Sequence, residues 1–241
     1  MQVAVLLYPG FTALDAIGPY EVLRWPPGTE LRFVATTTGP VVADSGVLVL
    51  GATHTLSETP APDIVLVPGG PGAFAAAADS AVLAWLRRVH PGTRWTVSVC
   101  TGSLVLAGAG LLQGRPATTH WAAERALAAL GAVPQPGERV VHGDRVATAA
   151  GVSAGIDLAL WLVEELHGRE RAEVAQLDIE YDPRPPVDAG HPSKASAAVR
   201  RLAMQDQIAL TRSSGQLGRS AAAVPALLWH STIRRIRARA R

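Results

Sequence analysis

The stretch from residue 95 to residue 114, WTVSVCTGSLVLAGAGLLQG, constrains the fold of this chain more than any other. It begins with an apolar run in which Val97 and Val99 alternate with polar residues, as in a strand. It continues through Thr-Gly-Ser into a segment of small residues typical of a helix. The strand therefore gives way to a helix within about two residues. Cys100, the only cysteine of the chain, stands at this junction.

Two interpretations of Cys100 follow from this position. A strand-to-helix corner pushes its side chain out of the sheet, and the first N–H groups of the helix face whatever that side chain attacks. The partial positive charge of a helix start also favours a thiolate, which predicts a nucleophile with a lowered pKa. A free cysteine is, however, just as commonly a small buried hydrophobe. This stretch alone leaves both interpretations open.

Apolar segments along the rest of the chain predict alternating strands and helices. We predict strands at residues 3–8, 31–37, 63–69, 95–99 and 117–121, a ribbon within 41–56, and a hairpin within 139–151 that turns at Gly143-Asp144. We predict helices at residues 12–24, 73–89, 122–131, the stretch that carries Ile156, Leu160 and Leu166 with Ser153 as its cap, and 169–181.

This alternation predicts an α/β fold, a mostly parallel central sheet with helices on both faces. Ligands bind such sheets at the carboxyl ends of the strands. Three features lie at such ends: Asp15 in the first turn of a helix, the Gly69-Gly70 pair, and Cys100. Asp15 also offsets a helix dipole, and paired glycines also form simple tight turns. The convergence of the three features favours a functional site.

The charge of the chain is unevenly distributed. Residues 200–241 contain nine arginines and one acidic residue, whereas residues 1–199 contain 13 basic and 19 acidic residues, a net charge of −6. The run PRPPVDAGHP, from residue 183, is typical of a domain end. We therefore predict one α/β domain over residues 1–190 and a basic C-terminal tail over 191–241 that is partly disordered or irregular.

Composition also bounds the partners of the chain. The N-terminus, MQVAVLLYPG, has no basic region, and its apolar run is too short for a signal peptide or a membrane span. We expect a cytoplasmic protein with no membrane partner. A single cysteine excludes an intramolecular disulfide and any multi-cysteine metal site. The arginine-rich end invites a nucleic-acid interpretation. We expect a solvated tail instead, because too few residues follow Pro192 for the usual pair of helix-turn-helix units.

Five segments resemble a known family: LLYPGFTALDAIGPYEVL, DIVLVPGG, SVCTGSLVLAGAGLLQGRPATTHW, GVSAGIDLAL and QLDIEYDPRPPVDAG. Over about residues 1–190 the chain resembles the ThiJ/PfpI superfamily, whose members are related to class I glutamine amidotransferases, and more narrowly its isonitrile hydratase branch. The resemblance implies a flavodoxin-like α/β sandwich with a cysteine nucleophile elbow. It also implies a homodimer that acts on a small molecule without a metal or cofactor.

Carried over position by position, the resemblance implies Cys100, Asp15 and Thr101 as catalytic residues. The backbone N–H groups of Gly70 and Thr101, beside Gly69, are implied as donors to a developing anion. Thr101 stands where protease-like members carry histidine, so an adjacent Cys-His dyad is absent. Many superfamily members also place glutamate at the position of Asp15.

The sequence offers one histidine near this region that could support the site. His120 follows the helix after Cys100 and could approach the end of the sheet. A structural, hydrogen-bonded histidine explains the same position equally well. Amidotransferases carry a late His-x-Glu pair, and none follows Cys100 in this sequence.

The implied activity is hydration of an isonitrile to an N-substituted formamide through a covalent thioimidate on Cys100, with Asp15 as general acid and base. A thiol and a carboxyl in contact are expected to share one proton, and the sequence does not fix which of them holds it. Two alternatives stay open. One is a non-catalytic ligand-sensing or transcription-regulator-like domain, and the other is a glyoxalase-like or deglycase-like cysteine enzyme acting on 2-oxoaldehydes.

Overall fold

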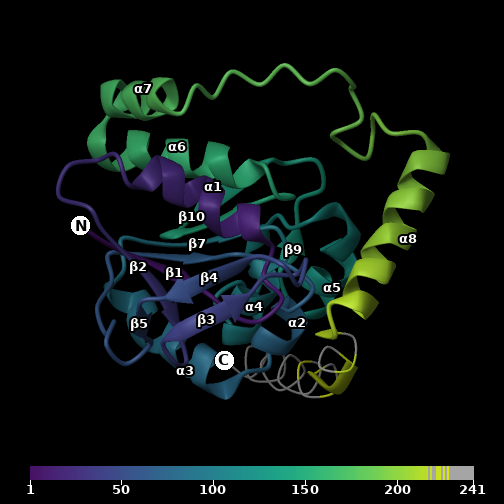
Figure 1. Cartoon of the computed structure of the whole chain (residues 1–241), viewed down its shortest axis with the longest axis horizontal. Coiled ribbons are helices and arrows are strands. Elements are labelled where there is room, and N and C mark those ends of the chain that lie inside the picture. Colours follow the sequence, from purple (N-terminus) through teal and green to yellow (C-terminus); the bar gives the residue numbers. More distant parts are fainter. Residues whose placement is uncertain (217, 219–220, 224, 226, 228–241) are drawn as a thin grey trace.

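A central sheet between two layers of helices forms the body of the molecule in a computed structural model, which describes residues 1–216, 218, 221–223, 225 and 227 (Figure 1). The strand order is β10-β11-β7-β6-β1-β2-β5, and only the pairing of β10 with β11 is antiparallel. The seven strands are β1 (Gln2–Leu6), β2 (Glu30–Ala35), β5 (His54–Thr55), β6 (Ile64–Val67), β7 (Trp95–Val99), β10 (Val140–Gly143) and β11 (Val146–Ala149). The predicted mostly parallel sheet is confirmed.

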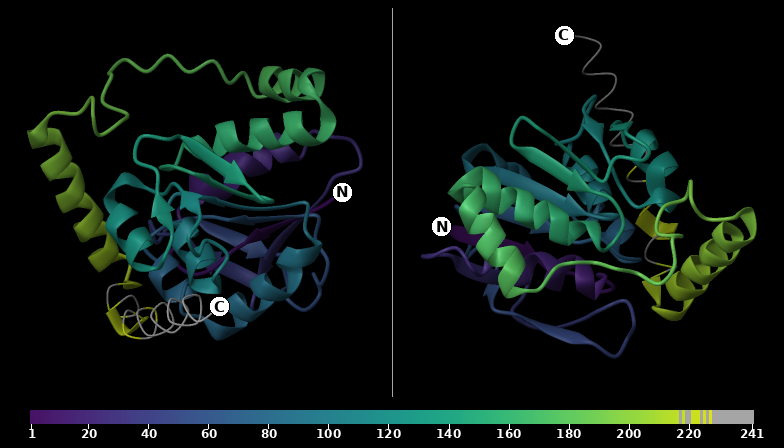
Figure 2. Two further views of the ribbon diagram at one scale, coloured as in Figure 1. Left: turned by 180° about the vertical axis from the view of Figure 1, so that it is seen from behind. Right: turned by 90° about the horizontal axis from the view of Figure 1, so that it is seen from above.

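Helices cover both faces of this sheet, as predicted (Figures 1 and 2). One face carries α1 (Ala13–Leu23) and α6 (Ala154–His167), and α7 (Arg169–Asp178) packs on the outer side of α6. The other face carries α2 (Ala73–Ala76), α3 (Ser80–Val89), α4 (Gly102–Ala109) and α5 (Glu124–Ala129), with 3₁₀ turns at His90–Gly92 and Trp121–Ala123. Two small sheets complete the body, an antiparallel ribbon of β3 (Gly39–Val42) and β4 (Val49–Ala52), and a pair of β8 (Pro116–Ala117) and β9 (Val133–Pro134).

The central strands are apolar because helices cover them on both sides. All four residues of β6, Ile-Val-Leu-Val, are completely buried. Parallel strands inside a three-layer sandwich have no solvent-facing side, so their sequences read as continuous apolar runs. This burial supplies the main favourable free energy of folding and fixes which loops meet at the carboxyl ends of the strands.

Close packing of α1 against α6 sets the position of the first helix. A Cβ atom on Gly155 of α6 would lie 3.0 Å from Val99 and 3.1 Å from Pro19 of α1. A Cβ atom on Gly18 of α1 would lie 3.1 Å from Ile156. The two helices therefore meet at glycine positions where larger side chains would force them apart. This contact places the start of α1 beside the carboxyl end of β7.

Two predicted elements differ from the structure because of local turn chemistry. The predicted helix 73–89 is two helices, since Asp79 starts α3 anew by accepting hydrogen bonds from the N–H groups of Ala81 (2.8 Å) and Val82 (3.2 Å). The hairpin turns at Asp144-Arg145, one residue later than predicted. Both turn residues have positive φ, 47° and 62°, as a two-residue turn between strands of right-handed twist requires.

Two further predictions were wrong in detail. The predicted strand 117–121 is limited to Pro116–Ala117, because the chain turns into the 3₁₀ helix that His120 precedes. Ser153 occupies the residue before α6, but its side chain makes no capping hydrogen bond.

The segment after residue 181 contains a helix that the sequence did not predict. Residues 181–196 have no helix or strand, and then α8 (Ala197–Ser213) follows, capped by Ser196, whose Oγ accepts from the N–H of Val199 at 3.3 Å. No residue of α8 is buried, so the helix lacks the core-facing apolar face on which a prediction from sequence depends. Figure 2 shows α8 standing out from the body. The predicted boundary at residue 190 stays a prediction, and the run RIRARAR lies outside the described residues.

We predict that Gly108→Ala destabilises the fold. A Cβ atom at Gly108 of α4 would overlap the carbonyl oxygen of Ala77, and backbone cannot move aside as a flexible side chain does. Overpacking of this kind costs about 1–3 kcal/mol. Urea unfolding followed by circular dichroism measures the change. Gly51→Ala in β4 is the control, because nothing lies within 4 Å of its Cβ position. Equal stability of the two variants would contradict the prediction.

Candidate active site

The strand-to-helix junction predicted at Cys100 is present, and its backbone is strained. Cys100 lies between β7 and α4 with φ of 57°, a region that residues other than glycine rarely adopt. Its N–H donates to the carbonyl oxygens of Ala149 (3.0 Å) and Ala150 (2.9 Å), and its carbonyl accepts from the hydroxyls of Ser103 (3.2 Å) and Thr119 (3.1 Å). These four hydrogen bonds hold the elbow in its unusual conformation.

The Gly69-Gly70 loop touches this elbow directly. A Cβ atom on Gly69 would lie 2.5 Å from the backbone nitrogen of Thr101 and 2.8 Å from the Cβ of Cys100. Gly102, the first residue of α4, packs just as closely on the carbonyl of Val67. Only glycine lets the two loops approach so near.

Asp15 is the residue of the first helix that faces this junction. Its side chain is completely buried, and its Oδ2 accepts the N–H of Gly69 at 2.8 Å. Burial raises the pKa of Asp15 to about 7, while hydrogen bonds from Gly69 and from the Cys100 side chain oppose the rise. The structure therefore brings Asp15 and Cys100 together. A role for Asp15 limited to offsetting the helix dipole does not account for this burial.

The pKa of the Cys100 thiol differs from the value that the sequence predicted. Burial, and then the negative charge of Asp15, raise the pKa of Cys100 well above its usual value. The N–H groups of Thr101 and Val152 and the hydroxyl of Thr101 lower it by less. The expectation that the helix start would lower this pKa was wrong, because loss of hydration outweighs those hydrogen bonds. At neutral pH the proton of the pair therefore lies on sulfur.

Thr101 and Gly70 are paired with each other. The N–H of Gly70 donates to Oγ1 of Thr101 at 2.8 Å, and that hydroxyl donates to the carbonyl of Gly70 at 3.1 Å. The N–H of Gly69 is already bonded to Asp15. The implied role of Gly70 as a donor to a developing anion stays a prediction. It requires the N–H of Gly70 to leave the Thr101 hydroxyl and donate to the substrate instead.

His120 lies near the elbow without reaching the reacting groups. Its Nδ1 accepts from the N–H of Ala122 at 3.4 Å, and its ring lies against Gly151. Burial lowers the pKa of His120, which favours the neutral ring. In the part of the chain that the structure describes, no hydrogen bond joins His120 to Cys100 or Asp15. Its supporting role stays a prediction.

Two residues at the site were missed by the sequence analysis. Val152 donates its backbone N–H to the sulfur of Cys100 and has a φ of 21°. A backbone donor has no residue-type signature, so no pattern could have revealed it. Tyr8 is buried at the end of β1 and donates its hydroxyl to the carbonyl of Pro68 at 2.5 Å. Its place just after the first strand was the one available signal.

No group of three or more His, Cys, Asp or Glu side chains among the described residues is arranged to hold a metal ion. No helix that they form is both long and apolar enough to cross a bilayer.

A sequence model for the DJ-1/PfpI family matches residues 1–165. This chain belongs to the DJ-1/PfpI family. Within it, the chain is 43% identical over 199 residues to isonitrile hydratase from Pseudomonas putida, which covers 83% of this chain and 86% of the relative. A THiJ/PfpI family protein from Pseudomonas syringae has a similar solved structure, with a TM-score of 0.83, 38% identity, and coverage of 92% of this chain and 89% of the other.

Transcriptional regulators are also among the proteins that this chain resembles. The chain is 33% identical over 182 residues to the HTH-type transcriptional regulator CdhR from Pseudomonas aeruginosa. The match covers 69% of this chain and 51% of the regulator, so this DJ-1/PfpI chain corresponds to about half of that relative.

We predict that Asp15→Asn stabilises the protein at pH 8. The pKa of Asp15 is about 7 in the folded state, against about 3.9 for an unfolded aspartate. Between these two pH values the folded state binds more protons than the unfolded state. The free energy of unfolding therefore falls as pH rises from 4 to 7. Asparagine removes the buried charge, and we expect a gain on the order of 2–4 kcal/mol at pH 8 that vanishes below about pH 4.

Urea unfolding at both pH values measures this effect. Asp178→Asn, an exposed position at the end of α7, is the matched control and should change stability little at either pH. A variant at position 15 that is less stable than the native protein at pH 8 would contradict the assignment of a buried, costly charge.

Proposed function

We propose that the protein hydrates an isonitrile to the N-substituted formamide, with Cys100 as the nucleophile and Asp15 as the proton carrier. The observation that carries the proposal is the burial of Asp15 at the elbow, where its carboxylate and the Cys100 thiol influence each other's pKa. The similarity to isonitrile hydratase over most of the chain supports the same reaction.

The first step requires that one carbon be attacked and protonated. The sulfur of Cys100 forms a bond to the terminal carbon of the isonitrile, and the thiol proton passes through the Asp15 carboxylate to that carbon. The product is a thioimidate, in which carbon carries sulfur, hydrogen and the double bond to nitrogen. A protonated Cys100 in the free enzyme suits this step, because the proton of its S–H group is the one that the isonitrile carbon receives.

The second step consumes one water molecule. Asp15, again a carboxylate, takes a proton from water as its oxygen bonds to carbon, and that proton goes to nitrogen. The tetrahedral intermediate then collapses, the C–S bond breaks, and the remaining hydroxyl proton returns to sulfur. The N–H groups of Thr101 and Val152, which point at the sulfur, would stabilise it as it leaves. Substrate and water account for every atom.

We further propose that the protein acts as a cytoplasmic homodimer on a small-molecule substrate and needs no cofactor. The family resemblance supports the dimer. Apolar residues of the β3–β4 ribbon add support, because Val42, Val47 and Val49 are 43%, 88% and 48% exposed in the single chain.

A second candidate function is a ligand-sensing regulator. The similarity to a helix-turn-helix regulator favours it. Residues 182–216 contain one helix, α8, and no pair of helix-turn-helix units is formed within this range. Salt-dependent, sequence-specific DNA binding without turnover of any isonitrile would select the regulator. Production of lactate from methylglyoxal would instead select the glyoxalase-like alternative.

We predict that Cys100→Ala reduces conversion of cyclohexyl isocyanide to N-cyclohexylformamide to the uncatalysed rate, because no other thiol exists in the chain. Asp15→Asn should reduce the rate by about 10²–10⁴-fold, the usual contribution of a general acid or base. Gas chromatography of the formamide measures both. Gly51→Ala, a substitution outside the site, is the control and should keep the native rate. Undiminished turnover by Cys100→Ala would exclude the covalent route, and full activity of Asp15→Asn would mean that another group carries the proton.

The pH profile offers an independent test. Asp15 must be ionised to accept the thiol proton, and its pKa is about 7. We therefore expect kcat/KM to fall about tenfold per pH unit below pH 7 and to level off above it. Initial rates from pH 5 to 9 measure this, with the Cys100→Ala rate subtracted at each pH. An activity that increases toward pH 5 would contradict Asp15 as the base.

A further inference from the structure

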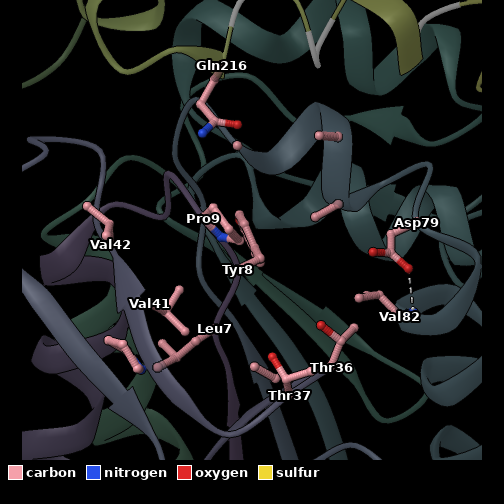
Figure 3. Close-up of a pocket in the computed structure, with 15 residues that line it drawn as sticks. Leu7, Tyr8, Pro9, Thr36, Thr37, Val41, Val42, Asp79, Val82 and Gln216 are labelled. Carbon is pink, nitrogen blue, oxygen red and sulfur yellow. Dashed lines mark hydrogen bonds between the residues drawn. The ribbon is translucent and has the colours of Figure 1, made fainter.

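A cavity lies near the elbow but does not include it. It has a volume of about 470 Å³, within the range of small-molecule sites. Its walls come from the carboxyl ends of β1 and β2, from α2 and α3, and from the segment after α8 (Figure 3). Neither Cys100 nor Asp15 lines it. Tyr8 connects the two places, since it lines the cavity and also feels the charges of Asp15 and Cys100.

Gln216 gives this cavity a polar atom in need of a partner. Its side chain is 5% exposed and packs on Gly10, where a Cβ atom would lie 2.8 Å from the Cγ of Gln216. Its Nε2 bonds the carbonyl of Ser214 at a long 3.5 Å. Its buried Oε1 has no hydrogen-bond donor among the described residues. An unsatisfied buried amide oxygen is unfavourable by about 1–3 kcal/mol, which a ligand donor would recover.

Asp79 supplies a second acceptor on another wall. Its Oδ1 caps α3, as the dashed line in Figure 3 shows, and its Oδ2 has no partner in the described part of the chain. No lysine or arginine lines the cavity among those residues, which disfavours an anion. Leu7, Val41 and Val82 add apolar surface. The lining therefore suits a molecule that donates hydrogen bonds and carries a compact apolar group.

We propose that this cavity binds a small compound with an N–H group on an aliphatic body, an alkylammonium ion or an N-alkylamide. Oε1 of Gln216 is buried in the described conformation, so a turn of the side-chain amide toward the cavity presents it to the N–H of the ligand, and the aliphatic body lies against Leu7, Val41 and Val82. The site is distinct from the Cys100 site and does not depend on the proposed reaction. The N-substituted formamide product of that reaction nevertheless belongs to the ligand class.

Isothermal titration with three probes of equal bulk tests the proposal: cyclohexylamine, N-cyclohexylformamide and cyclohexanecarboxylate. We expect the amine or the formamide to bind the native protein and Cys100→Ala equally, and the carboxylate not to bind. Gln216→Leu should weaken binding about tenfold, the effect of one lost hydrogen bond. Gln207→Leu, on an exposed position of α8, is the matched control and should leave the affinity unchanged.

Two more variants identify the ligand and guard against misfolding. Asp79→Asn keeps the helix cap, so weaker binding of cyclohexylamine alone would identify the ammonium ion as the ligand form. Gln216→Glu keeps an acceptor oxygen and should retain cyclohexylamine binding, which a merely disrupted C-terminal segment would not. The proposal is overturned if neither nitrogen probe binds at millimolar concentration, if Gln216→Leu binds as tightly as the native protein, or if Cys100→Ala loses binding.

Discussion

The conformation of Cys100 is the constraint on which the site depends. A φ of 57° is unfavourable for a residue with a side chain by about 1–3 kcal/mol. Four hydrogen bonds, two from the N–H and two to the carbonyl, each contribute about 0.5–1.5 kcal/mol and together are comparable with that strain or larger. Their partners come from the end of β11, from α4 and from Thr119. The elbow is therefore held by three separate parts of the chain.

Burial then decides the chemistry of the pair at this elbow. Asp15 and Cys100 are both buried, and loss of hydration is the largest influence on both pKa values. The N–H groups that point at the sulfur are too few to stabilise a thiolate beside a carboxylate. The site rests with a protonated sulfur and a carboxyl near its titration point, a state suited to moving one proton back and forth.

Sheet topology explains why the site and the cavity are neighbours. β1 lies between β6 and β2, so the loop after β1 borders both the Gly69-Gly70 loop and the end of β2. Helix α1 lies on one face of the sheet and α2 on the other, and ligand sites in such sheets form where successive helices leave on opposite faces. Tyr8 connects the two places, because it lines the cavity together with Gln216 and also feels the charges of Asp15 and Cys100.

The sequence by itself determined the order of strands and helices, the parallel sheet, and the junction at Cys100, because buried parallel strands need continuous apolar runs and sharp junctions need small residues. It did not reveal α8, which buries no face, or the break at Asp79 inside an apparently continuous helix. Only the tertiary structure decided the burial of Asp15, the proton on Cys100, and the packing of Gln216 on Gly10. A pKa depends on all the atoms that exclude water around a group, and a contact between residues 10 and 216 exists only once the chain has folded.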